Sequence, residues 1–146
     1  MRSRHHAREI AFSTLYALDF NKELKIGYEF KDFSTISEEE LTKIDDQTKL
    51  FARFLVVGTL EHLEEIDNLI SQYSINRPID KIDLIDRNIL RISVFSLLYM
   101  KNVHQKVVIT EAIRLSQEYS RQMNYKFING ILDSMQKELN DNTKNT

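Results

Sequence analysis

Glycine and proline are scarce in this sequence, and their scarcity limits what the chain can fold into more than any other feature. Only three glycines and one proline occur among the 146 residues. Sheets with many tight turns need both residue types, whereas long helices need neither. Hydrophobic residues make up 42% of the chain, which is enough for a buried core. The composition therefore predicts one all-α domain that covers residues 1–146.

Apolar residues recur at steps of three and four, the spacing that buries one face of a helix. This periodicity predicts long helices over residues 4–20, 46–73, 86–99, 107–119 and 124–137. A shorter helix is expected around 26–33. Ser37 and Glu40 have the spacing of a capping box, which marks the start of another short helix.

Two residues bear on how these helices pack. Pro78 is the best internal boundary, because proline disfavours helix in the residue before it. We therefore expect a helical bundle in two halves, residues 1–77 and 78–138, followed by a disordered tail at 139–146. Gly58 lies within the longest predicted helix, where it allows either a close approach of another helix or a local kink.

The net charge of -2 hides an uneven distribution along the chain. Residues 1–22 carry a net charge of +2, residues 23–67 carry -7 and residues 68–146 carry +3. Positive ends around an acidic middle are typical of a protein with a polyanionic partner. Simple solvation of exposed helix faces would give the same pattern.

The first predicted helix has a second face opposite its apolar one. At about 100° per residue, His5, Arg8, Phe12 and Tyr16 fall in a single stripe. Arginine neutralises phosphates and aromatic rings stack on unpaired bases, so the stripe suits single-stranded nucleic acid. Phe12 and Tyr16 are also compatible with packing against another helix.

Several kinds of chemistry are absent from the sequence. Without cysteine, the chain has neither disulfides nor a thiolate zinc site. It contains no P-loop, GxSxG, HExxH or Rossmann glycine pattern, so we expect no enzyme and no bound cofactor. His62 with Glu61 and Glu65 could form a metal cluster, but a solvated helix face explains them better, and no metal is expected. No apolar run reaches membrane-spanning length, which favours a cytoplasmic protein without a membrane partner.

Four separated stretches carry a resemblance to a known family. They are RHHAREIAFSTLYALDF, DRNILRISVFSLL, KVVITEAIRLSQEYS and KFINGILD, in that order along the chain. Over nearly its whole length the sequence resembles the NusB family of bacterial transcription antitermination factors. It departs from the family pattern at His104 and Thr110, where proline and asparagine are usual. It also departs at His5 and His6, where arginine is usual, and a pH-sensitive RNA affinity is one expectation from that change.

The resemblance implies an all-helical fold of two three-helix halves and a role without catalysis. Members of the family pair with a ribosomal small-subunit protein, NusE, and bind a boxA element in nascent ribosomal RNA transcripts. The pair joins RNA polymerase with other Nus factors and promotes elongation, and some members form homodimers. The alternative for this chain is a helical scaffold that binds only protein.

The resemblance also implies two binding surfaces. The residues expected to bind RNA are Arg2, Arg4, His5, His6, Arg8, Tyr119, Lys126, Phe127 and Asn129. The residues expected at the interface with NusE are Phe12, Tyr16 and Asp86. Other roles stay open for some of them: Phe127 lies on an apolar stripe and is also a core candidate, Asn129 and Gly130 could serve helix packing, and Asp86 could simply cap a helix.

Overall fold

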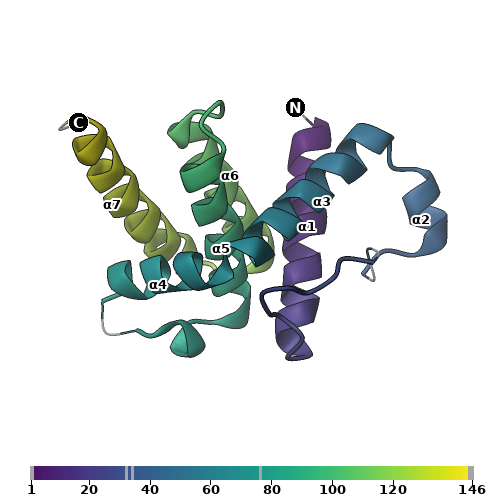
Figure 1. The fold of residues 1–146 in the computed structure, drawn as a ribbon, viewed down its shortest axis with the longest axis horizontal. Helices are drawn as coiled ribbons and strands as arrows, with labels where there is room; N and C mark the ends of the chain where they lie inside the picture. The colour runs from purple at the N-terminus through teal and green to yellow at the C-terminus, as the bar shows by residue number, and fades with distance from the viewer. Residues whose placement is uncertain (1, 32, 34, 76, 145–146) are drawn as a thin grey trace.

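The structure is a computed structural model that describes the backbone of residues 2–31, 33, 35–75 and 77–144, with side chains over the same residues except 2–3 and 142–144. Within this part of the chain all regular structure is helical (Figure 1). The elements are α1 (Arg2–Phe20), α2 (Glu38–Thr42), α3 (Asp46–Glu61), α4 (Leu63–Tyr73), the short 3-10 turn η1 (Ile79–Lys81), α5 (Leu84–Tyr99), α6 (Gln105–Tyr119) and α7 (Asn124–Lys144). The predicted all-α class is confirmed. None of the described helices combines the length and apolar character that crossing a membrane requires.

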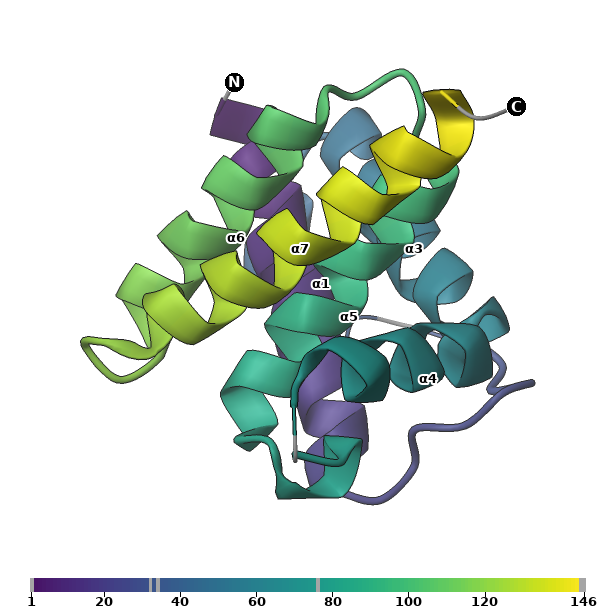
Figure 2. The ribbon, with the colours of Figure 1, turned by 90° about the vertical axis from the view of Figure 1, so that its left-hand side faces the viewer.

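Helix α5 is the centre of the molecule. It packs against α1 and α3 on one side, and against α4, α6 and α7 on the others (Figures 1 and 2). Ile89, Leu90 and Ile92 of this helix are at most 2% exposed, in a core shared by all of these neighbours. Pro78 lies between α4 and α5, where a boundary was predicted, but a single apolar core continues across it.

Gly58 marks a close approach between α3 and α5. A methyl group added there would lie 2.2 Å from the ring of Phe95, well inside contact distance. The close-approach interpretation of this glycine is therefore confirmed. The break in the predicted 46–73 helix falls instead at His62, which separates α3 from α4. The His62 ring stacks on Tyr99 with centroids 4.0 Å apart, a long-range contact that periodicity does not reveal.

Three other features of the structure differ from the sequence prediction. The described residues of 26–33 form a turn and an irregular segment rather than a helix. Asp83, not Asp86, caps α5 by accepting a hydrogen bond from the backbone N–H of Ile85 at 2.9 Å. Helix α7 continues through Lys144, so residues 139–144 are helical where a disordered tail was predicted. Leu139 packs partly buried against the core and extends the apolar stripe by one more turn. The cap at Ser37 is as predicted: its hydroxyl accepts from the N–H of Glu40.

A network of charges fastens α1, α4 and α5 together. Asp19 at the end of α1 accepts from both Arg87 and Arg91, at 2.7 and 2.8 Å. Arg91 is 5% exposed and also donates to Asp67 of α4 at 2.8 Å. Asn88 donates to Asp19 and accepts from Arg91. These charged side chains therefore have several hydrogen-bonding partners within the protein, which offset the cost of burying an ion pair.

Candidate nucleic-acid interface

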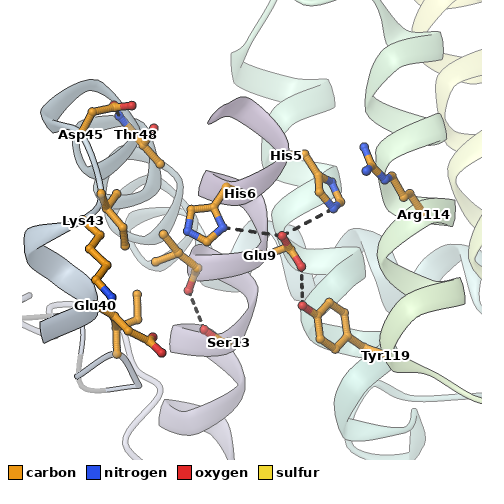
Figure 3. Close-up of a pocket in the computed structure, with 13 residues that line it drawn as sticks. His5, His6, Glu9, Ser13, Glu40, Lys43, Asp45, Thr48, Arg114 and Tyr119 are labelled. Carbon is orange, nitrogen blue, oxygen red and sulfur yellow. Dashed lines mark hydrogen bonds and ion pairs between the residues drawn. The ribbon is translucent and has the colours of Figure 1, made fainter. Parts of the chain in front are cut away.

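The basic end of α1 lies between α3 and α6 (Figures 1 and 3). Arg4 is exposed, and its guanidinium carbon lies 4.3 Å from the centre of the Phe51 ring of α3. A cation over an aromatic face is held by the ring quadrupole, so Arg4 is positioned while it stays open to solvent. The side chain of Arg2 lies outside the described residues.

Arg8, one helical turn further along α1, is buried instead. It is 6% exposed, lies 5.5 Å from the same Phe51 ring, and its Nη1 atom is 4.0 Å from a carboxylate oxygen of Glu111. Burial lowers the pKa of Arg8, Glu111 raises it and Arg4 lowers it further, with a net decrease. The position therefore ties α1 to α3 and α6, and it is closed to the direct phosphate contact that the sequence suggested.

His5 is also buried, at 8% exposure, among carboxylates. Its Nδ1 atom is 2.9 Å from Glu111 and its Nε2 atom is 3.2 Å from Glu118, both on α6. Glu9, one turn along α1, lies 3.6 Å from the same Nε2 atom. His6 is exposed on the other side of Glu9, with 3.7 Å between them (Figure 3). Of the two histidines in the predicted arm, His6 is exposed and His5 is largely buried.

Tyr119 presents an aromatic face at the end of α6. Its ring packs on Phe12 of α1 with centroids 5.3 Å apart, and the residue is 43% exposed. Its hydroxyl donates to Glu9, and burial followed by this hydrogen bond raises the pKa of the tyrosine above its usual value. Tyr119 and His6 line the same surface hollow, which Arg114 also borders (Figure 3). A flat ring and cationic or polar groups therefore share one open face.

Aromatic rings continue from Phe12 along α1. Phe12 is 5% exposed, so it contributes to the core as well as to the stripe. Tyr16 lies 6.2 Å from Phe12 and 6.3 Å from Phe20, and exposure along the row rises to 66% at Phe20. Packing against another helix, one of the two interpretations of the predicted stripe, is therefore observed at Phe12, which contacts Tyr119 of α6.

The start of α7 carries the remaining predicted RNA residues. Lys126 and Asn129 are exposed. Phe127 is partly buried, packs against the core, and lies 4.8 Å below the guanidinium of Arg77. Gly130 has no neighbouring atom that a methyl group would touch, so a packing role for this glycine is wrong.

Asp86 is placed inside the molecule rather than at a partner interface. It is 2% exposed and accepts hydrogen bonds from Ser120 at 2.6 Å and Asn124 at 2.8 Å. Burial raises the pKa of Asp86, and the hydrogen bonds from Ser120 and Asn124 offset only part of that rise. Asp86 thus fixes the turn between α6 and α7, and through it the positions of Tyr119 and Lys126.

Sequence reasoning missed the acidic groups that surround the arm. Glu9 could have been found, because it lies one turn from His5 on the same helix. Glu111 and Glu118 could not, because they are more than 100 residues away along the chain. Phe51, whose ring lies under both arginines, falls within the helix predicted over 46–73, but the periodicity does not indicate this contact.

Comparison with known proteins identifies the family. The family model described as "NusB family" matches residues 5–137. The transcription antitermination protein NusB of Borreliella burgdorferi is 35% identical over 136 residues, which cover 92% of this chain and 94% of that protein. Among solved structures, NusB of T. maritima superposes with a TM-score of 0.79 at 34% identity, covering 92% of this chain and 91% of that one.

A second solved structure is that of antitermination factors NusB and NusE in complex with dsRNA. It superposes with a TM-score of 0.76 at 28% identity, covering 94% of this chain and 98% of that one. Family model, relatives and fold agree over nearly the whole length, and the chain belongs to the NusB family of transcription antitermination factors, which are not enzymes.

Proposed function

We propose that this chain is an RNA-binding adaptor that pairs with NusE and binds a boxA element of nascent ribosomal RNA transcripts. Membership of an antitermination family supports the role, and a NusB–NusE complex with RNA is among its structural neighbours. RNA polymerase with other Nus factors is the assembly that the pair would join, in the cytoplasm where transcripts are made. The proposal also includes a homodimer of this chain.

The observation that carries the proposal is the open face shared by α1 and the end of α6. The exposed ring of Tyr119 lies in the same hollow as His6 and is backed by Phe12. A supported ring can stack on an unpaired base, a contact worth about 1–3 kcal/mol. Arg4 of α1 and Lys126 of α7 are exposed and offer cationic groups to phosphates. Asn129 is exposed beside Lys126 and can hydrogen-bond to a base edge.

The other predicted RNA residues then have indirect roles. Arg8 and His5 are buried between α1 and α6, where they hold the two helices that carry Arg4 and Tyr119. Phe127 supports the start of α7 from the core side. For the NusE surface, Tyr16 and the exposed Phe20 beside it are the better candidates, since Phe12 and Asp86 are buried.

The experiment is a titration of labelled boxA RNA followed by fluorescence anisotropy, with and without NusE. Replacing Arg4 and Lys126 together by alanine should weaken binding, and the slope of log affinity against log salt should become shallower by about 1.4, at about 0.7 per single-strand phosphate contact. Tyr119→Ala should weaken binding with little change in that slope, because stacking releases no counterions.

Lys137→Ala is the matched control, because this lysine is exposed on α7 and pairs with Asp133 of its own helix. It should leave affinity unchanged. RNA affinity that is equal in all four proteins, or RNA binding that is absent while NusE still binds, would favour the protein-only scaffold instead.

A further inference from the structure

One imidazole in this protein faces three carboxylates. His5 of α1 has Glu111 at its Nδ1 atom, and Glu118 and Glu9 at its Nε2 atom, at 2.9, 3.2 and 3.6 Å. Ligand atoms of His5, Glu9 and Glu118 all lie within 4.8 Å of one another. The His5 side chain itself is only 10% exposed. No sequence motif indicates this cluster, because its members come from opposite ends of the chain.

The hydrogen-bonding pattern of His5 is incomplete in its neutral form. In the tautomer with a proton on Nδ1, His5 donates to the carboxylate of Glu111, whose same oxygen lies 4.0 Å from Nη1 of Arg8. The lone pair of Nε2 then points at Glu118 and Glu9, which are also acceptors. In this tautomer Nε2 of His5 and the two carboxylate oxygens converge as acceptors, an arrangement that a metal ion between them would complete.

The other charged groups near the cluster do not fill this place. Arg114 is exposed, and its Nε atom lies 3.4 Å from Oε1 of Glu118, the oxygen that also faces His5. Tyr119 donates to the second oxygen of Glu9, and His6 approaches Glu9 from the solvent side at 3.7 Å. Each of these groups contacts one of the two carboxylates, whereas Nε2 of His5 lies within 3.6 Å of both.

We propose that Nε2 of His5 and the carboxylates of Glu9 and Glu118 bind a divalent transition-metal ion of the zinc class. Bonds of about 2.0–2.2 Å at tetrahedral angles separate neighbouring ligand atoms by about 3.3 Å, close to the spacings from Nε2 of His5 to the two carboxylates. Glu111 serves as the carboxylate that fixes the tautomer and orientation of a metal-binding histidine. One imidazole among oxygen ligands favours zinc, cobalt or nickel over magnesium or calcium, which prefer oxygen alone.

The bound ion would join α1 to α6. Because Glu9 also holds Tyr119, and Arg4 precedes His5 by one residue, a metal here sets the distance between the cationic and aromatic parts of the open face. The proposed metal site consists of side chains from α1 and α6, so metal binding can be tested without RNA.

The test is zinc binding by the metal-free, untagged full chain in competition with a chromophoric chelator. We expect one ion per chain, no displacement by excess magnesium, and a rise in Tm when zinc is added. Glu118→Gln should weaken binding about tenfold or more while it preserves the shape of the side chain, and Glu111→Gln should weaken it by a similar factor through His5. His62→Gln and Glu65→Gln, in the other histidine and carboxylate group, should bind as the parent does.

Cobalt provides a second readout that does not depend on stability. The visible absorption of bound Co²⁺ should appear with the parent chain and disappear with His5→Gln, even if this variant has a lower Tm without metal. Zinc affinity that is unchanged in His5→Gln and Glu118→Gln would overturn the proposal. Stoichiometric binding that His62→Gln abolishes, or no binding at all at neutral pH, would also overturn it.

Discussion

At the scale of single residues, two of the three glycines differ in the space around them, although both lie inside helices. Gly58 faces the ring of Phe95, and an added methyl group would overlap it at 2.2 Å. Phe95 is 2% exposed and in contact with Phe54 and Tyr99, so it has little room to move. Gly130 meets nothing within 4 Å. Hydrophobic periodicity does not distinguish the crowded position of Gly58 from the open position of Gly130.

We expect Gly58→Ala to destabilise the protein by about 1–3 kcal/mol, the usual cost of overpacking a filled core. Gly130→Ala is the matched control and should be stabilising by up to about 1 kcal/mol, because alanine has the higher helix propensity and meets no obstacle. Urea unfolding followed by far-ultraviolet circular dichroism measures both. Equal free energies of unfolding for the two variants would contradict the close approach of α3 and α5.

At the scale of helices, the sequence predicted features that depend on residues close together in the chain and missed features that depend on contacts between distant residues. Helix α6 was predicted to within two residues at its start, because Val108, Ile109 and Ala112 repeat at helical spacing and all are buried. The break at His62 was missed because it involves stacking on Tyr99, 37 positions away in the sequence. The candidate site follows the same rule: Arg4 and Tyr119 are exposed, as contact with RNA requires, whereas Arg8 and Asp86 are buried by helices that periodicity cannot orient.

The turn between α6 and α7 depends on one side chain of α5. Asp86→Ala removes the acceptor for Ser120 and Asn124 and leaves both donors in a partly buried turn. We expect a loss of about 1–3 kcal/mol, the penalty for unsatisfied groups. Hydrogen exchange should show the effect where it arises, with faster exchange at residues 120–124 and unchanged exchange within α3. A uniform increase over the whole chain would instead mean that Asp86 acts on the core.

At the scale of the whole molecule, the charge network around Asp19 connects the end of α1 to α4 and α5. Burial alone would raise the pKa of Asp19. Hydrogen bonds from Arg87 and Asn88 and the charge of Arg91 outweigh it, so the pKa lies below its usual value. The ionised form is therefore favoured in the folded state. Its stabilising effect is complete above the unfolded-state pKa of about 4 and is lost as pH falls through the lower folded-state pKa.

This linkage predicts a pH-dependent difference between the parent and Asp19→Asn. Near neutral pH the substitution should cost about 3 kcal/mol or more, because it leaves Arg91, which is 5% exposed, without one of its two carboxylates. Below about pH 4 the difference should shrink, since the parent then loses the same interaction by protonation. Asp133→Asn, which removes a carboxylate from an exposed pair with Lys137, should change stability little at any pH. Urea unfolding of the three proteins from pH 7 to pH 3 provides the measurement. A cost of Asp19→Asn that stays constant over this range would mean that packing, and not the charge of Asp19, fastens the first helix to the rest of the molecule.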